Sequence, residues 1–324
     1  MSEAAVAVAP GVWLVNLPLP FPVGSINVYL LRAPDGFLLF DCGLKTRGCR
    51  EGLAAALAQV GIEWRRIRQL VISHLHPDHF GLAAEIRGLS GAAVLMHRVE
   101  AARMLPAWRD RDAVARHWAW LAEHGVPPAD SEEIAQTSHG VAEFIDAVEV
   151  DRELEDGDRL PLEEGELEVL WTPGHSPGLI SLYLRERRLY FSSDHIIQKI
   201  TPNIGLYGAS AANPLADYLA SLTRVRDLEI DLILPSHGRP FNGHREWIAA
   251  TEEHHRGRCR RMLDAVSSAA RTAYEVVGFE WGPHLSPLNE RFAVAETLAH
   301  MEYMRQQGRV ETWRENGLVY WRKA

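Results

Sequence analysis

Three histidines and one aspartate lie within six consecutive residues of this 324-residue chain. They belong to the segment Ser73-His74-Leu75-His76-Pro77-Asp78-His79-Phe80-Gly81, which follows the apolar run Leu70-Val71-Ile72. The apolar run is typical of a buried strand, and Pro77-Asp78 is typical of the turn into a helix. A turn at a strand end can direct several side chains to one point, and imidazole with carboxylate suits zinc and similar divalent cations. We therefore interpret the four side chains as candidate metal ligands rather than as solvated loop residues.

The order His-x-His-x-Asp-His after an apolar strand resembles the signature of the metallo-β-lactamase superfamily. This resemblance implies three further ligands downstream, a histidine, an aspartate and a histidine, each placed just after a strand. Three later segments match in that order, namely Thr172-Pro173-Gly174-His175, Leu189-Tyr190-Phe191-Ser192-Ser193-Asp194 and Leu232-Ile233-Leu234-Pro235-Ser236-His237. Each segment alone is a weak signal, but four in the right order are specific. The resemblance covers nearly the whole chain.

The resemblance also implies how the ligands share two metal ions. One ion is expected on His74, His76 and His175, a second on Asp78, His79 and His237, with Asp194 bridging the two. Zn²⁺ is the first choice of metal, and Fe or Mn are alternatives. Two such cations can convert a bridging water into a hydroxide near neutral pH, which then attacks a carbonyl or phosphoryl centre.

Three further interpretations concern residues beside the ligands. Asp41 ends the apolar segment Gly36 to Phe40 and matches the aspartate that lies beneath the metal site in the family and orients it, while a simple turn cap is the alternative. Asp78 is also a candidate to receive or deliver a proton. His195, directly after Asp194, is a candidate catalytic residue for oxyanion or leaving-group contact.

Composition narrows the class of protein. The chain is 47% hydrophobic, and it contains no apolar stretch near the roughly 20 residues that span a bilayer. Three cysteines without a close pair, and an N-terminus without a basic segment and long apolar core, indicate a cytoplasmic protein that does not enter membranes. The formal net charge of -9 weighs against a nucleic-acid partner, because phosphate backbones are bound mainly by Lys and Arg.

The resemblance predicts an α/β fold, the four-layer αββα metallo-β-lactamase sandwich. We expect a catalytic domain over residues 1–243, interrupted by a helical insertion at about 98–146. Apolar side chains recur at helical spacing in this insertion, at Met104, Leu105, Trp108, Val114, Trp118 and Leu121. They could line a lid over the metal cleft, or they could pack the insertion onto the body of the protein, and the spacing alone leaves both interpretations open.

Residues 244–324 have a different character and resemble a small winged-helix-like C-terminal domain. Helical periodicity is followed by two short strands on either side of Asn316-Gly317, which is a strong hairpin signal. Basic residues run from Arg256 to Arg261, but Glu252, Glu253 and Asp264 nearly balance them. We therefore favour a role in packing, in forming a homodimer or in completing a pocket over binding of nucleic acid.

The lead hypothesis is hydrolysis of an ester, thioester or lactone bond in a small-molecule acyl substrate. An apolar insertion and an acidic chain suit a neutral or acyl substrate better than a polyanion. One alternative is an endoribonuclease of the lactamase-like type, motivated by the winged-helix-like tail. Another is an enzyme similar to the persulfide dioxygenases, which keep the His-x-His-x-Asp-His string but use one iron ion. The diiron flavoprotein branch is disfavoured, because it carries glutamate where this chain has His76.

Overall fold

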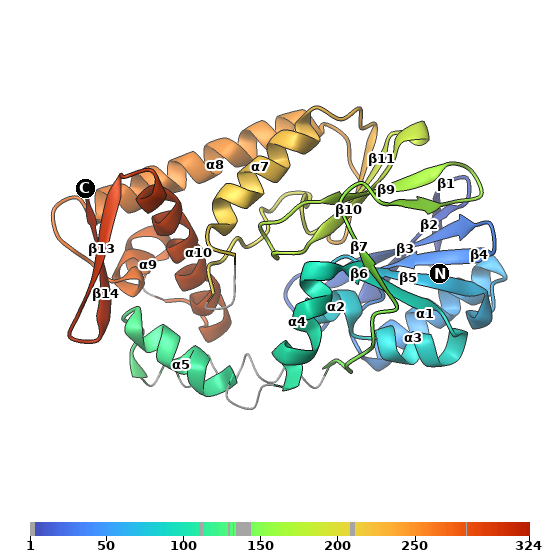
Figure 1. Cartoon of the computed structure of the whole chain (residues 1–324), viewed down its shortest axis with the longest axis horizontal. Coiled ribbons are helices and arrows are strands. Elements are labelled where there is room, and N and C mark those ends of the chain that lie inside the picture. The colour runs from blue at the N-terminus through green and yellow to red at the C-terminus, as the bar shows by residue number, and fades with distance from the viewer. Residues whose placement is uncertain are drawn as a thin grey trace.

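The computed structural model describes residues 4–109, 113–128, 130–131, 133, 144–207, 211–282 and 284–324. Two β-sheets lie face to face in the right half of Figure 1, and helices cover their outer faces. The C-terminal helices and a hairpin form the left half of the same view.

The first sheet has seven strands that follow one another in chain order. They are β1 (Val6–Ala9), β2 (Val12–Pro18), β3 (Ser25–Ala33), β4 (Gly36–Phe40), β5 (Ile67–Ile72), β6 (Ala93–His97) and β7 (Arg152–Leu154). The strands β1 to β4 pair antiparallel, whereas β4 to β7 pair parallel. Parallel pairing needs crossover connections, and α1 (Arg47–Val60) with the short η1 (Trp64–Arg66) and α3 (Ala83–Ser90) supply two of them.

The second sheet has five strands in the order β12-β11-β10-β9-β8. They are β8 (Arg159–Pro161), β9 (Glu166–Trp171), β10 (Ile180–Leu184), β11 (Leu189–Ser193) and β12 (Leu232–Pro235), with η3 (Arg185–Arg187) between β10 and β11. Helix α7 (Pro214–Arg226) carries the chain from β11 to β12, which pair parallel. Strands β7 and β8 lie on either side of the turn at Asp156-Gly157-Asp158, but they belong to different sheets.

Side-chain alternation along the strands creates four layers. On β3, Leu30 packs toward α1 and α3, while Leu31 packs toward the second sheet. On β10, Leu182 packs toward the first sheet, while Tyr183 packs toward α7. Successive side chains of a strand point to opposite faces, so each sheet is buried on both sides. The order helix, sheet, sheet, helix confirms the predicted αββα sandwich.

The insertion after β6 connects the two halves of the molecule. Its helices are α4 (Arg98–Arg109), which lies against the first sheet, and α5 (Ala113–Glu123), which lies near the C-terminal hairpin (Figure 1). Leu121 and Val126 are buried in the cluster that also contains the C-terminal helices, so this end of the insertion packs as core. The predicted lid-lining side chains of Met104, Leu105, Trp108 and Val114 lie outside the description.

The C-terminal region contains α8 (His244–Ala265), α9 (Ala273–Trp281) and α10 (Pro287–Gln306), followed by the hairpin strands β13 (Val310–Glu315) and β14 (Leu318–Lys323). Helices followed by a small hairpin confirm the predicted order of elements. The turn places Asn316 and Gly317 at positive φ, as a two-residue hairpin turn requires. One apolar cluster joins α7 and the second sheet to α8, α9 and α10.

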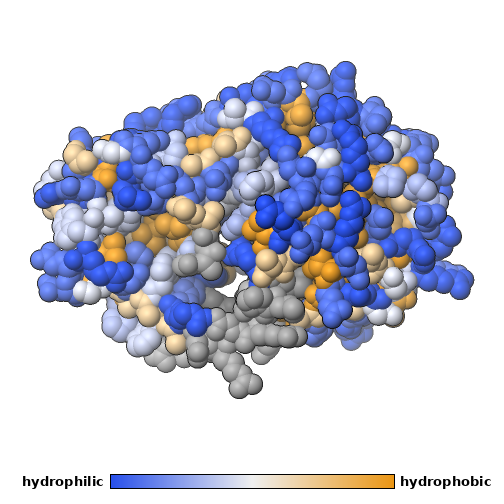
Figure 2. Space-filling view, in the orientation of Figure 1, coloured by the Kyte–Doolittle hydropathy of each residue, from blue (hydrophilic) through white to orange (hydrophobic). Residues whose placement is uncertain are grey.

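The face shown in Figure 2 is largely hydrophilic, with apolar side chains visible as small patches scattered across the view. Within the described part of the chain, no helix combines the length and apolar character that crossing a membrane requires.

Candidate metal centre

Four strand ends bring the predicted ligands to one edge of the sandwich. Strand β5 is followed by the loop with His74 and His76 and by the short helix α2 (Pro77–Phe80), in which Pro77 occupies the first turn. A proline there presets the backbone angle for helix and loses no hydrogen bond. The other ligands follow β9, β11 and β12, at His175, Asp194 and His237.

The first group of side chains consists of His74, His76, His175 and Asp194. The Nε2 atoms of His74 and His175 each lie 2.9 Å from Nδ1 of His76. Oδ2 of Asp194 lies 3.4 Å from Nε2 of His175. Two ligands of one tetrahedral zinc ion are about 3.3 Å apart when each lies about 2.0 Å from the metal. The spacing of this group therefore suits a single cation.

The second group consists of Asp78, His79 and His237, and Asp194 connects it to the first. Oδ2 of Asp78 lies 3.4 Å from Nε2 of His237 and 3.9 Å from Nε2 of His79. Asp194 places Oδ2 at 3.5 Å from His79 Nε2 and Oδ1 at 3.5 Å from His237 Nε2. One carboxylate therefore faces both groups. The structure brings all seven predicted ligands together.

Two buried atoms test whether these residues fit metal ions. Nε2 of His79 and Oδ1 of Asp194 are buried and have no hydrogen-bond partner within the described part of the chain. Leaving such atoms unsatisfied costs about 1–3 kcal/mol each, so native proteins rarely contain them without a ligand or water. Imidazole nitrogens together with carboxylate oxygens are the donors that zinc and related divalent cations take. The residues present fit a pair of such ions.

Oxygen acceptors outside the cluster orient the histidine rings. Nδ1 of His74 donates to Ser73 Oγ at 2.9 Å. Nδ1 of His175 donates to the Asn203 carbonyl at 2.9 Å, and Nδ1 of His237 donates to the Ser25 carbonyl at 2.8 Å. A proton held on Nδ1 leaves the lone pair of Nε2 free. These contacts therefore select the tautomer in which Nε2 faces the cluster, as metal-binding histidines usually require.

Asp41 lies beneath the cluster and contacts the ligand His79 and the neighbouring Ser73. Its Oδ2 accepts a hydrogen bond of 2.8 Å from His79 Nδ1 and one of 2.9 Å from Ser73 Oγ, and its Oδ1 accepts from the Ser73 nitrogen at 2.8 Å. Asp41 itself has a φ of 60°, a left-handed conformation that is uncommon for residues other than glycine. Ser193, which donates to Ser73 Oγ at 2.7 Å, has a φ of 50°. Asp41 and Ser193, both with positive φ, thus both hold the Ser73 side chain.

Burial and charge act in opposite directions on the groups of the cluster. Burial holds the pKa of His74 well below its ordinary value, and neighbouring histidines add to the effect. Burial opposes ionisation of Asp194, but His237 and His79 outweigh it and hold the pKa of that carboxyl well below its usual range. Burial is likewise outweighed at Asp78, where the same two histidines lower the pKa. Both aspartates are therefore carboxylates at neutral pH, ready to meet cations.

Glu100, on α4, is a supporting residue that sequence reasoning missed. Its fully buried carboxylate accepts from the Leu75 nitrogen at 3.0 Å, from the Gly178 nitrogen at 2.7 Å and from Ser176 Oγ at 2.5 Å. It thereby joins the loop carrying His74 and His76 to the loop carrying His175. A side chain in the place of the hydrogen of Gly178 would meet Glu100 Cγ at 2.7 Å, so the close approach requires glycine. No local pattern distinguishes Glu100 from other glutamates of the chain.

His195 is not brought to the ligand cluster, contrary to the expectation of oxyanion or leaving-group contact. Its ring is buried beside Tyr190 and Tyr218, and Nδ1 lies 2.7 Å from the Tyr190 hydroxyl. Burial lowers the pKa of His195 to about 3, so the ring is neutral. Asp194 and His195 lie in the turn after β11, where Ser193 has a φ of 50° and the His195 nitrogen donates to the Ser192 carbonyl at 3.0 Å. In this turn Asp194 faces the ligands, whereas the His195 ring packs against Tyr218 of α7.

The comparison with known families decides where this chain belongs. The family model described as the metallo-beta-lactamase superfamily matches residues 21–237, which include all seven ligands and Asp41. The chain belongs to the metallo-β-lactamase superfamily. A second model, described as the metallo-beta-lactamase-like C-terminal domain, matches residues 259–324. The chain is thus a metallohydrolase of this superfamily, whose members generally use divalent metals.

Individual members of the superfamily resemble the chain over most of its length. A metallo-beta-lactamase family protein from Thermus thermophilus is 32% identical, with a TM-score of 0.87 over 98% of this chain and 100% of that one. The probable metallo-hydrolase YqjP of Bacillus subtilis is 26% identical over 95% of this chain and 96% of its own length. The chicken acyl-coenzyme A thioesterase MBLAC2 is 28% identical over 69% of this chain and 76% of its own.

Proposed function

We propose that this protein hydrolyses acyl thioesters at a dinuclear metal centre, with zinc as the metal. Metal-dependent hydrolysis is supported by the two ligand groups that Asp194 joins. The carboxylate oxygens of Asp194 lie 3.4–3.5 Å from the Nε2 atoms of His175, His79 and His237. The choice of a thioester is supported by the similarity to relatives named acyl-coenzyme A thioesterase, from chicken and human.

We assign the ligands as the sequence predicts. His74, His76 and His175 hold the first ion, Asp78, His79 and His237 hold the second, and Asp194 bridges them. When bound, such a pair of cations lowers the pKa of a shared water and stabilises negative charge on a carbonyl oxygen. Asp41 and Glu100 hold the ligand loops in place through the hydrogen bonds described above. His76 is exposed, and Asp78 is partly exposed at 17%, so substrate is expected to approach from their side.

The acid-base character of the site supports a thioester over an amide. Histidines that bind a metal must be neutral, and burial already lowers the pKa of His74 and His175. Among the described residues that form the site, no side chain then carries a proton to donate when the reaction begins, which favours a leaving group that needs none. A departing thiol has a pKa of about 8.5 and leaves as a thiolate, whereas an amine must be protonated before it can leave. Asp78, as a carboxylate, can accept the proton of a reacting group.

We further propose that the C-terminal region completes the core instead of binding nucleic acid. Leu298, Met301 and Met304 of α10 share one buried cluster with Tyr218 of α7 and Ile233 of the second sheet. The face of α10 that carries these side chains is buried against α7 and the second sheet, so it is not available to bind RNA. A homodimer and a cytoplasmic location stay predictions from the sequence.

The test is a panel of substrates on purified protein of known metal content. Thiol release from acyl-coenzyme A, S-acyl glutathione and S-acyl N-acetylcysteamine is compared with hydrolysis of lactones and β-lactams, with cleavage of RNA and with oxygen uptake on a glutathione persulfide. We expect thioesters to be hydrolysed, His76→Ala to abolish the activity, and His284→Ala, at an exposed histidine outside the site, to retain it. Cleavage of RNA or oxidation of persulfide without thioester hydrolysis would replace the proposal with the corresponding alternative.

A further inference from the structure

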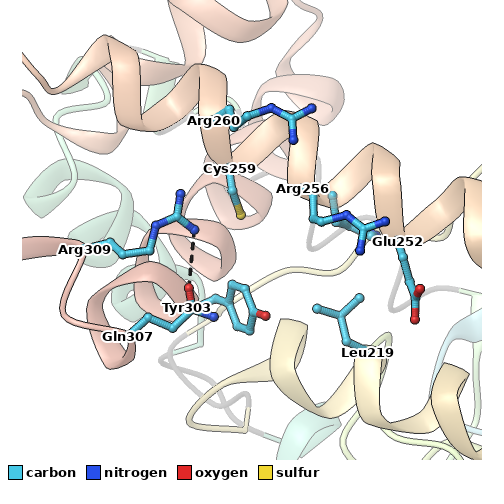
Figure 3. A pocket seen from close by; sticks show the side chains of 9 residues that line it. Leu219, Glu252, Arg256, Cys259, Arg260, Tyr303, Gln307 and Arg309 are labelled. Carbon is cyan, nitrogen blue, oxygen red and sulfur yellow. Dashed lines mark hydrogen bonds between the residues drawn. The ribbon is translucent and has the colours of Figure 1, made fainter.

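A cavity lies away from the metal centre, between α7, α8 and α10. Its volume is about 490 Å³, and its lining includes none of the seven ligands. Figure 3 shows Arg256 and Cys259 extending from α8 toward Tyr303 of α10 and Leu219 of α7. The thioesterase proposal makes no use of this cavity.

The rim of the cavity is positively charged, although the chain as a whole has a net charge of -9. Three arginines line the cavity, Arg256, Arg260 and Arg309, and Glu252 is the one carboxylate among the described residues of its lining. Glu252 pairs with Arg226, which neutralises it. The lining therefore carries an excess of positive charge, which attracts anions.

The three arginines differ in their ion-pair partners. Arg256 and Arg260 share Glu253, at 2.9 Å and 2.8 Å, and all three side chains are more than half exposed. Exposed pairs of this kind contribute little to stability, so a ligand can compete for the guanidinium groups. Arg309 donates to the Gln307 amide at 3.3 Å and has no carboxylate partner within the described residues (Figure 3). Its charge is thus available to a ligand.

A buried histidine among the lining residues has one ring nitrogen without a partner. His255 is 1% exposed, and its Nδ1 lies 3.0 Å from Nε2 of His300. His300 donates from its own Nδ1 to the Glu296 carbonyl at 2.7 Å, so its Nε2 must accept the proton of His255 Nδ1. Burial lowers the pKa of His255 to about 2, which keeps the ring neutral. Nε2 of His255 therefore carries a lone pair, and it is buried without a partner in the described part of the chain.

His255, Glu296 and His300 are close enough together to be considered as a cation site. Their hydrogen bonds argue against it. Both ring nitrogens of His300 are engaged, and Glu296 is held by Arg258 and by Asn203 Nδ2. Only His255 Nε2 remains, and one nitrogen beside several arginines does not make a cation site. An anionic ligand that can also donate a hydrogen bond suits the cavity better.

We propose that this cavity is a binding site for a hydrogen phosphate group, either inorganic phosphate or the phosphate of a small molecule that also carries a hydroxyl. The charged oxygens would meet the guanidinium groups of Arg309 and Arg256. The P–OH, or a neighbouring hydroxyl, would donate to His255 Nε2. Guanidinium pairs with phosphate through charge-assisted hydrogen bonds, and the donated hydrogen satisfies a nitrogen that is otherwise orphaned. The volume exceeds that of one phosphate group and leaves room for an organic part.

Calorimetric titration at pH 7 tests this site, using inorganic phosphate and sulfate as probes, with ribose 5-phosphate to distinguish a sugar phosphate from the free ion. Sulfate has the same charge as hydrogen phosphate but no hydrogen to donate. We expect saturable binding of phosphate that is at least tenfold tighter than that of sulfate. Arg309→Gln should weaken phosphate at least tenfold, and His255→Phe should remove the preference over sulfate. Arg305→Gln, outside the cavity on the same helix as Tyr303, is the matched control.

The metal centre is the competing place for phosphate, and variants separate the two. Binding that survives Arg309→Gln but is lost in His76→Ala would assign phosphate to the metals and overturn the proposal. Equal affinity for sulfate would overturn the role of His255, and absence of saturable binding would overturn the site. The readout is binding, so it does not depend on whether thioesters are the substrate. Metal content and hydrolysis should be unchanged in Arg309→Gln, which shows that the variant is folded.

Discussion

The carboxylate of Glu100 accepts a hydrogen bond of 2.7 Å from the backbone nitrogen of Gly178, although the two residues are 78 positions apart in the chain. The other oxygen of Glu100 accepts from the Leu75 nitrogen, between His74 and His76. A single buried side chain from the insertion therefore sets the distance between the two loops that carry the first ligand group. The insertion supports the metal centre directly as well as contacting the C-terminal region.

Replacing this carboxylate by an amide should weaken the support. In the unaltered protein Glu100 accepts from the backbone nitrogens of Leu75 and Gly178. In Glu100→Gln, an –NH₂ donor replaces one of the two accepting oxygens and faces a backbone N–H. An unsatisfied buried donor costs about 1–3 kcal/mol, so we expect the free energy of unfolding to fall by about 2 kcal/mol in urea titrations. Metal should also be lost faster to a chelator. Glu155→Gln is the control, since Glu155 is exposed and pairs with Arg98 at the surface. Equal stability of the two variants would contradict the role of Glu100.

Asp41→Asn tests the support beneath the second ligand group. The amide keeps the shape but loses the charge that faces His79 Nδ1 at 2.8 Å. Mutation of the residue that accepts from a metal-binding histidine typically lowers metal affinity about 10–100-fold. We expect a change of that size in competition with a chromogenic chelator. Asp231→Asn, at an exposed aspartate that pairs with Arg188, should leave the affinity unchanged. Unaltered affinity in Asp41→Asn would reduce Asp41 to a turn cap.

Asp194→Asn tests the bridge between the two groups. An amide nitrogen is a poor metal ligand, so the variant can offer at most one oxygen where the protein offers two. We expect metal analysis to find one tightly bound ion or none, with loss of hydrolysis. Asp227→Asn, at an exposed helix end, serves as the control. Retention of two tightly bound ions in Asp194→Asn would disprove the bridging role.

Stability should decrease on acidification through the buried His300. Burial lowers its pKa from the ordinary value of 6.5 to about 3. Below pH 6.5 the unfolded chain binds a proton that the folded protein refuses, so stability is complete above that pH and is lost as the pH falls toward 3. The loss is about 1.4 kcal/mol per pH unit. Between about pH 6.5 and 5.0, the unfolding free energy of His300→Gln should therefore fall by about 2 kcal/mol less than that of the unaltered protein. An equal fall in the two proteins would contradict the prediction.

Local signals predicted the elements that carry the ligands. Short apolar runs ending in polar turns correspond to β5, β11 and β12, because a buried strand must be apolar on both faces. Helix starts are harder to predict from local residues. Helix α10 begins at Pro287, where Ser286 caps the first turn. Helix α1 begins at Arg47, where Thr46 caps it. Both caps were visible in the sequence, but Ser and Thr are also common in loops.

The amino-acid sequence by itself determined the superfamily, the sandwich and the seven candidate ligands, because their order and spacing follow from strand ends that each need only local residues. Only the tertiary structure decided which other groups hold those ligands. Glu100, the Asn203 carbonyl and the Ser25 carbonyl come from distant segments, and a backbone carbonyl has no side-chain identity to read. It also placed His195 in the core, because the chain turns at Ser193, whose φ of 50° is uncommon for a residue other than glycine and has no local sequence signal.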